Sequence, residues 1–419
     1  MVSDAADYFS YAYNLKHLGV YSNALTWASE ASPTGAPPDS LRPPGYPLFL
    51  LAIPGLDTTD VYLRRVALVQ AMLGVASVLL AFSLAGRILR PGWSHLAAAV
   101  LAISPHIANM SNYLLTESLF LFVLLASIQV SLLALDSGAR KMLLAAGLLW
   151  GLCSLVRPTV LFLPPLFVFM SFVLPKLRSH RQDAWLVLAA FLAVQSPWFI
   201  RNQVTTLDPQ TSLMVGTLHH GSYPGFMFEN RPETHGWPFR FDPDAERVEQ
   251  SLTNVLFDIA DKFRRDPLTY ANWYFLGKPG TFLSWGFVQG KDIYVFETRR
   301  SPYLEDPVFI QMRTVSRLMH WPLMLLGVAG ALVILWRPHW LLIEGQALTA
   351  AKLLSCVVLY AIVFHMVVAP YPRYGVPFRP LIYILALAIP CALIRGRFSR
   401  GEQPSPASQP DSRAFSRRP

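Results

Sequence analysis

Residues 66–89 read VALVQAMLGVASVLLAFSLAGRIL, a run without acidic residues and with one arginine near its end. A membrane-spanning α-helix needs about 20 mostly apolar residues, so this run predicts a transmembrane helix. Similar runs fill most of the chain. We expect nine spans, at residues 66–89, 93–109, 113–135, 141–156, 158–175, 184–200, 318–336, 349–369 and 376–394. The sequence therefore predicts an all-α polytopic membrane protein.

Two places depart from a simple series of spans. Arg157-Pro158 separates the runs 141–156 and 158–175. Because proline disfavours a helical conformation at the preceding residue, these runs form either two helices or one long kinked element. Residues 46–56 (YPLFLLAIPGL) are apolar but too short to span, which indicates a juxtamembrane or re-entrant piece.

The composition argues against other classes of protein. Charged residues make up 15% of the chain and apolar residues 53%, whereas soluble domains carry about 25% charged residues. The net charge of +9 could indicate nucleic-acid binding, but the basic residues lie at the ends of apolar runs and in the tail. We therefore expect no nucleic-acid partner. The three cysteines all lie within apolar runs, which indicates packing residues rather than disulfides or metal ligands.

Loop charges predict the orientation. Arginine and lysine gather at alternate ends of the apolar runs, while the short loops at the other ends carry almost none. The positive-inside rule places the basic side in the cytoplasm. The expected parts are an outer segment at 1–61, a helix bundle at 62–200, a large outer segment at 201–317, C-terminal helices at 318–394 and a disordered basic cytoplasmic tail at 395–419.

The predicted start of the chain is irregular. An outer N-terminus without a preceding apolar segment is difficult to insert. One further helix before Met1 would make the series of spans regular. We therefore expect that a first transmembrane helix is missing from this sequence.

The two outer segments have helical patterns of their own. Ser3 to Leu18 predicts a helix whose acidic residues, in the simplest interpretation, complement its dipole. The apolar residues between Val248 and Phe263 follow an amphipathic helical spacing. Pro267 to Phe287 is rich in aromatic residues, with Lys278 among them, as is typical of a bilayer interface. This stretch either covers the entrance for a lipid tail or simply rests on the membrane.

Charged residues far apart in the sequence converge on the outer face. Each arginine alone could extend to lipid phosphates, but charges near membrane helices usually face an interior or a cavity. The converging residues are Asp4, Asp7, Arg42, Glu117, Arg201 and Arg373. His219 and His220 also offer a metal pair, although adjacent histidines point apart in most backbones, so we do not expect them to bind a metal together.

These stretches resemble a known family. DAADYFSYAYNL (4–15) followed by RPPGYPLFL (42–50) is similar to the first outer loop of the GT-C-type glycosyltransferases. The likeness is greatest to the bacterial group related to protein O-mannosyltransferases and the lipid A aminoarabinose transferase. The later motifs, in family order, are LLTESLFLF (114–122), AGLLWGLCSLVRPTVL (146–161), SPWFIRNQ (196–203) and PRYGVPFRPLI (372–382). The resemblance covers about residues 4 to 390. Family members carry a transmembrane helix before the acidic motif.

The resemblance implies an enzyme that moves a sugar from a polyprenyl phosphate to a hydroxyl group. Asp4 takes the place of the family's catalytic aspartate and would accept the proton of the attacking hydroxyl, with inversion at the sugar. Asp7 is a second candidate, and Glu117 matches the family's second acidic position. Asp4 and Glu117 could also hold a divalent metal, which stays open. The residues expected to bind substrate or phosphate are Tyr8, Arg42, Tyr46, Arg201, Lys278, Arg373 and Tyr374.

The expected setting is the bacterial inner membrane, with the site facing the exterior. The acceptor could be a cell-envelope glycan, a lipid or a protein. Three alternatives stay open: a lipid-linked oligosaccharide polymerase or ligase, a polytopic transporter, and an inactive relative that serves as a structural subunit. Transporters usually show paired repeats with broken helices near the midplane, and no clear repeat is present here.

Overall fold

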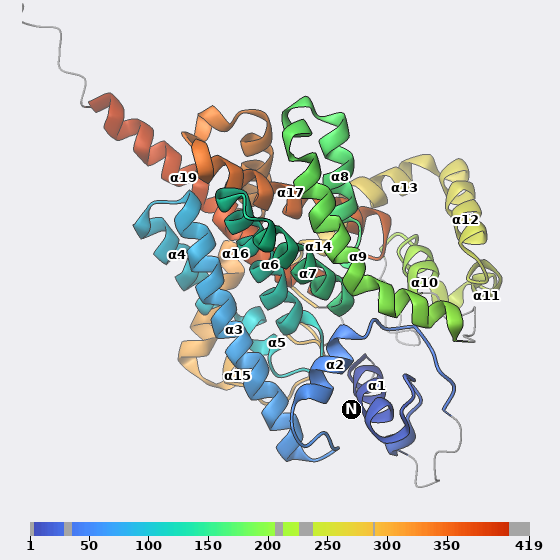
Figure 1. Cartoon of the computed structure of the whole chain (residues 1–419). Coiled ribbons are helices and arrows are strands. Elements are labelled where there is room, and N and C mark those ends of the chain that lie inside the picture. Colours follow the sequence, from blue (N-terminus) through green and yellow to red (C-terminus); the bar gives the residue numbers. More distant parts are fainter. Residues whose placement is uncertain (1–3, 29–35, 206–212, 226–237, 288–289, 402–419) are drawn as a thin grey trace, which may run out of the picture.

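A computed structural model describes residues 4–28, 36–205, 213–225, 238–287 and 290–401, and within these the chain forms helices and no strand. Six helical segments are long and apolar enough to cross a membrane, which confirms the all-α, multi-pass prediction. The long helices are α3 (Asp60–Ile88), α6 (Glu117–Ser137), α9 (Arg181–Val204), α16 (Pro307–Trp336), α17 (Gly345–Val367) and α19 (Arg379–Gly401), shown as a bundle in Figure 1.

The other three predicted spans are shorter helices: α4 (Pro91–Ala102), α7 (Arg140–Val156) and α8 (Leu163–Val173). Helices end before Pro105 and before Pro158, because proline favours an extended conformation at the preceding residue. Ser104 is extended before Pro105, so the predicted run 93–109 divides into α4 and the short α5 (Pro105–Met110). Arg157 is extended, with ψ 123°, before Pro158. The stretch 141–175 is therefore two helices rather than one kinked helix.

Small residues allow the central helices to approach closely. A Cβ atom at Gly147 of α7 would overlap the backbone of Val187 in α9, and one at Gly327 of α16 would overlap Ile382 in α19. Such close contacts between small residues are a main way in which membrane helices associate. They hold α7 and α9 in one pair and α16 and α19 in another.

The outer segments form short helices against this bundle. In Figure 1, α1 and α2 lie at one end of the bundle, and α10 to α13 lie along its side. The remaining elements are α1 (Asp4–Leu18), α2 (Gly45–Ala52), α10 (Leu213–His220), α11 (Ala245–Val248), α12 (Leu252–Arg265), α13 (Pro267–Asn272), a π-helical turn (Trp273–Gly277), α14 (Lys278–Phe282), α15 (Pro302–Glu305) and α18 (Pro372–Gly375). Single 3₁₀ turns lie at Thr26–Ala28, Pro158–Val160, Pro175–His180, Pro238–Phe241, Pro338–Leu341 and Val376–Phe378.

The predicted amphipathic helix at 248–263 is broken in two. Val248 ends α11, and the Ser251 hydroxyl accepts a hydrogen bond from the backbone N–H of Asn254 to begin α12. Ser251 is thus an N-cap that the apolar spacing did not reveal. The stripe still faces one core, because Val248 and Val255 are buried together with two apolar residues of α10.

The ends of the chain depart in part from the expected boundaries. Helix α1 confirms the predicted helix from Asp4, the first described residue, to Leu18, and Ser3 lies outside the described residues. Helix α19 continues to Gly401, past the end of the last predicted span at 394. The helix therefore includes the start of the predicted tail, and residues 402–419 lie outside the described part of the chain.

Candidate active site

Asp4 lies between two arginines that come from distant parts of the chain. Its Oδ1 is 2.7 Å from Nη2 of Arg42, in the loop before α2, and its Oδ2 forms an ion pair with Arg373 of α18. The same Arg42 nitrogen is 2.9 Å from Oδ2 of Asp7. The structure thus brings together four of the residues that the sequence placed at the outer face.

Glu117 continues this network from the first turn of α6. Its side chain is 2% exposed, and its Oε1 is 3.0 Å from Nη2 of Arg157 and 3.7 Å from Nε of Arg373. Three carboxylates therefore face three guanidinium groups. We call these six residues the arginine–carboxylate cluster: Asp4, Asp7, Glu117, Arg42, Arg157 and Arg373.

Arg157 is a member that the sequence analysis did not select. It ends α7 in an extended conformation and is 8% exposed. Two signals were available: it is a basic residue on a face almost free of charge, and it lies within a motif that carries the family resemblance. In the pattern of apolar runs it stands out only as the boundary, with Pro158, between two of them.

Aromatic rings line the arginines. The Arg157 guanidinium lies 4.0 Å from the centre of the Tyr374 ring, and that of Arg42 lies 5.4 Å from the Tyr8 ring. Tyr46 packs edge-on to Tyr8 at 5.1 Å. All three predicted tyrosines, Tyr8, Tyr46 and Tyr374, therefore lie at or next to the cluster. Stacking of this kind stabilises a buried guanidinium and fixes its plane.

A buried glutamine anchors this region to the bundle and was also missed. The Tyr46 hydroxyl donates to Oε1 of Gln70 in α3 at 2.9 Å. The Gln70 amide donates to the backbone carbonyls of Ser111 and Tyr113 at 2.9 and 2.8 Å. A polar residue inside a predicted span was the available signal, because buried polar groups need partners.

The cluster lies at a large apolar cavity of about 800 Å³. Mainly apolar side chains line it, from α8, α10, α17 and the turn between α7 and α8. Its wall on α17 extends from Cys356 to Val368, roughly 18 Å at 1.5 Å per residue. Arg42 and Arg157 supply its only charged lining among the described residues. The cavity thus joins a long apolar space to a cationic group, which suits an anion on a hydrocarbon tail.

Arg201 does not join the cluster, contrary to expectation. Its guanidinium donates to the backbone carbonyls of Asp39 and Tyr21 at 2.6 and 3.2 Å. It also lies 5.2 Å from the Trp198 ring. The end of α9 faces the loop after α1 rather than the cavity, so Arg201 fastens that loop.

Lys278 is also separate from the cluster. It is fully buried, donates to the backbone carbonyl of Val367 at 3.0 Å, and lies 3.6 Å from the Tyr274 ring. Burial lowers the pKa of the Lys278 ammonium to about 6. Burial thus disfavours the charged ammonium here, and a neutral amine is a poor ligand for phosphate.

The charge of Asp4 follows from its surroundings. Burial alone would raise the pKa of the Asp4 carboxyl, but Arg373 and Arg42 outweigh burial and lower the pKa well below its usual range. Asp4 is therefore ionised at any physiological pH. While both arginines hold it, it is a weak proton acceptor.

The predicted metal position at Asp4 and Glu117 does not fit this arrangement. Both oxygens of Asp4 and Oε1 of Glu117 face guanidinium groups, and only Oε2 of Glu117 has no hydrogen-bond partner. A divalent cation would have to lie among three arginines. We derive no chemical step through a metal at this position.

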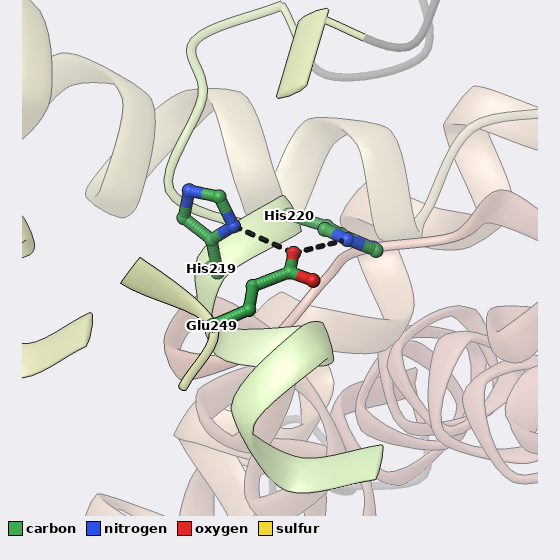
Figure 2. A group of neighbouring side chains, drawn as sticks. All are labelled: His219, His220 and Glu249. Carbon is green, nitrogen blue, oxygen red and sulfur yellow. Dashed lines mark hydrogen bonds and ion pairs between the residues drawn. The ribbon is translucent and has the colours of Figure 1, made fainter. Parts of the chain in front are cut away.

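The prediction that His219 and His220 point apart is wrong. Nδ1 of His219 and Nε2 of His220 lie 2.7 and 2.8 Å from the same oxygen of Glu249 (Figure 2). Both histidines end α10, and Glu249 follows α11 and reaches the same point. Among the described residues, this is the one group of histidine, cysteine or acidic side chains whose geometry suits a metal ion.

Comparisons with known proteins give one family match and several remote structural similarities. Residues 42–200 match the family model of dolichyl-phosphate-mannose-protein mannosyltransferases. No curated protein matches the chain. The archaeal oligosaccharyltransferase AglB of Archaeoglobus fulgidus, solved with an inhibitory peptide and dolichol phosphate, aligns with 16% identity and a TM-score of 0.49. The alignment covers 95% of this chain but 47% of AglB, so the chain spans about half the length of that relative.

A second solved structure, ArnT of Cupriavidus metallidurans bound to undecaprenyl phosphate, aligns with 14% identity and a TM-score of 0.40. That alignment covers 94% of this chain and 74% of ArnT. Both structural similarities are remote. The family match is independent of them and includes Arg42, Glu117 and Arg157. Over residues 42–200 the chain matches the dolichyl-phosphate-mannose-protein mannosyltransferases, which confirms the resemblance that its sequence motifs indicated.

Proposed function

We propose that this protein transfers a sugar from a polyprenyl-phosphate donor to a hydroxyl acceptor at the outer face of a membrane. The observation that carries the proposal is the apolar cavity with Arg42 and Arg157 in its wall. A polyprenyl tail would lie along α17, and its phosphate would reach the two arginines. The family model supports this donor class, because dolichyl-phosphate mannose is part of its name.

Arginine suits this phosphate better than lysine would. A guanidinium binds a phosphate through two parallel N–H···O bonds and keeps its charge when buried. Tyr374 lies against Arg157 and Tyr8 against Arg42, so both cations are held in fixed planes before the donor arrives. Such preorganisation favours electrostatic stabilisation of the charge on the leaving phosphate.

Donor binding would also activate Asp4. Arg42 contacts both Asp4 and the cavity, so a phosphate in the cavity competes with Asp4 for this guanidinium. Because Arg42 and Arg373 lower the Asp4 pKa, loss of one of these contacts raises the pKa towards that of an ordinary carboxyl. Asp4 would then become a better proton acceptor only when the donor is present.

The reaction follows from these positions. The acceptor oxygen attacks the anomeric carbon while the bond from that carbon to the phosphate oxygen breaks. The polyprenyl phosphate leaves with the electron pair, and Arg42 and Arg157 balance its charge. Asp4 takes the proton of the acceptor hydroxyl. A single attack from the opposite face inverts the anomeric centre.

The location forms part of the proposal. The positive-inside distribution supports a site on the exterior side of a bacterial inner membrane, with 1–61 and 201–317 outside. Acceptors available there are a cell-envelope glycan, a lipid or a protein hydroxyl.

A transfer assay tests the proposal. Membranes that contain the full chain are incubated with a panel of labelled polyprenyl-phosphate sugars and envelope acceptors, and Asp4→Asn is compared with the wild type. General-base catalysis contributes about 10²–10⁴-fold, so we expect Asp4→Asn to lose at least about 100-fold. Asp57→Asn, at an exposed aspartate of the same outer segment, is the matched control and should keep full activity.

Near-wild-type transfer by a correctly inserted Asp4→Asn protein would remove Asp4 from the mechanism. Absence of transfer by the wild type with every donor, together with absence of binding of undecaprenyl phosphate, would refute the proposed donor class.

A further inference from the structure

We propose that His219, His220 and Glu249 bind a divalent cation of the zinc class, which fastens α10 to the segment that leads into α12. Nothing in the proposed sugar transfer requires this site. Two imidazole nitrogens and one carboxylate oxygen form a ligand set that suits zinc. The three side chains converge on one point from two elements (Figure 2).

The distances leave a small adjustment for metal binding. His219 Nδ1 and His220 Nε2 lie 2.7 and 2.8 Å from Oε1 of Glu249. Zinc bonds of about 2.0–2.2 Å in tetrahedral geometry place ligand atoms about 3.3 Å apart. The ligands therefore need to separate by about half an ångström around an ion. Side-chain rotation alone supplies such a movement.

Tyr223 supports the orientation of the His219 ring. The Tyr223 hydroxyl donates its one proton to Asp242 and lies 2.9 Å from Nε2 of His219. The other ring nitrogen, Nδ1, lies 2.7 Å from the Glu249 oxygen. The Tyr223 contact thus holds Nδ1 towards the carboxylate, where a cation would replace the hydrogen bond between them.

The same contacts form the support that metal ligands usually have. Ligand histidines normally hydrogen-bond through their second nitrogen to a carboxylate or a bridging group, which fixes the tautomer. Here the connection runs from His219 through Tyr223 to Asp242. The His220 ring is held in another way, stacked on Phe239 with centroids 3.6 Å apart and an angle of 9° between planes.

The local charge favours a cation. The carboxylates of Glu249, Asp242, Asp258 and Asp244 lie in this region. The cations among them are Lys262, 2.7 Å from Asp258, and Arg247, 3.2 Å from Asp244. Apart from the two histidines, four negative charges therefore face two positive charges. A divalent ion balances this excess.

The burial of the ligands indicates how the coordination would be completed. His219 is fully buried, whereas the side chains of His220 and Glu249 are 25% and 35% exposed. Two ligands therefore border solvent, and a water molecule can fill the fourth position. The protein supplies a site that is closed on the His219 side and open on the other.

The position of α10 gives the ion a structural role. Leu213, Met214, Thr217 and Leu218 of α10 line the apolar cavity, and the two histidines follow directly. An ion at the end of α10 would fix this helix as a wall of the cavity. Metal binding would therefore stabilise the outer segment internally, at the point where α10 borders the cavity.

Direct zinc binding tests the site. The full chain is purified in lipid nanodiscs, stripped with a chelator, desalted, and titrated with Zn²⁺, and bound zinc is measured by mass spectrometry. We expect stoichiometric binding by the wild type and by His339→Ala, which removes an exposed histidine elsewhere. His220→Ala and the shape-conserving Glu249→Gln should lose it. Tyr223→Phe should weaken affinity by about 10–100-fold, as expected for a supporting residue.

Hydrogen exchange provides a second readout. Zn²⁺ at 100 times its Kd should slow exchange of the α10 amides by up to about 100-fold if exchange requires release of the ion. Unchanged zinc binding in both His220→Ala and Glu249→Gln, or absence of binding by the wild type, would overturn the proposal. Neither measurement uses sugar transfer, so failure here is distinguishable from failure of the proposed function.

Discussion

The arginine–carboxylate cluster and the group formed by His219, His220 and Glu249 differ in the charge that they lack. In the arginine–carboxylate cluster, three carboxylates are matched by three guanidiniums, and two of these cations also line the cavity. In the histidine–glutamate group, one carboxylate oxygen faces two imidazole nitrogens, and the nearest lysine is paired elsewhere. The first arrangement can exchange its own carboxylates for an incoming phosphate. The second arrangement offers nitrogen and oxygen ligands to a cation.

The comparison shows that buried or half-buried acidic residues of one protein need not share a role. The partners of Glu117 are arginines, whereas those of Glu249 are histidines. Arginine stays charged and excludes metal, whereas neutral histidine is itself a metal ligand. The partner therefore decides which ligand each carboxylate can help to bind.

Removing the buried carboxylate should have the largest effect. Glu117→Ala leaves Arg157 buried without its 3.0 Å ion pair, and breaking a buried pair costs about 3–5 kcal/mol. We expect a large loss of thermal stability in nanodiscs. The matched control is Asp136→Ala, which breaks the more exposed pair with Arg87 and should cost at most about 1 kcal/mol. Equal losses in the two variants would show that the cluster is not a tightly coupled network.

Replacing a cavity arginine by lysine should mainly affect the donor. Arg157→Lys keeps the charge but loses the planar fork and the stacking on Tyr374. Hydrogen bonds to charged groups contribute about 1.5–3 kcal/mol, so we expect undecaprenyl phosphate to bind about 10–100-fold more weakly.

Arg201→Lys is the comparison for that measurement. Arg201 contacts backbone carbonyls outside the cavity, so its replacement should leave lipid-phosphate affinity unchanged. A matching loss of affinity in both variants would place the phosphate somewhere other than at Arg157.

Lys278 offers a test of a buried amine that has no carboxylate partner among the described residues. In the folded protein its pKa of about 6 lies below the usual value of about 10.4. At a pH between these two values, the Lys278 amine therefore binds a proton in the unfolded chain but not in the folded protein. Stability therefore rises with pH in that window and falls as pH drops towards 6. One proton corresponds to at most about 1.4 kcal/mol per pH unit.

Thermal unfolding between pH 7 and pH 8 measures this slope. Lys278→Met keeps most of the side-chain volume and removes the titrating group, so its stability should depend less on pH than that of the wild type. The same slope in both proteins would assign the pH dependence to other groups.

The sequence predicted the elements better than the partners. Apolar length and proline positions account for the long helices and for the breaks at Ser104 and Arg157. Loop charge predicts which helix ends lie outside the membrane, and that orientation stays a prediction. The direction in which each helix end faces around the bundle could not be predicted, because it depends on packing between helices. Arg201 and Arg157 both lie at helix ends that loop charge assigns to the outside, yet Arg201 contacts the loop after α1 and Arg157 contacts Glu117.

The smallest expected effect comes from two substitutions that distinguish the role of the Tyr374 ring from that of its hydroxyl. The ring lies 4.0 Å from the Arg157 guanidinium, and a cation–π contact contributes about 0.5–1 kcal/mol when exposed and about 2 kcal/mol when desolvated. Tyr374→Phe keeps the ring and should bind undecaprenyl phosphate like the wild type. Tyr374→Leu should bind it about 2–5-fold more weakly. If Phe and Leu weaken binding equally, the hydroxyl contacts the donor, and Tyr374 would then be a direct phosphate or sugar ligand rather than a support for Arg157.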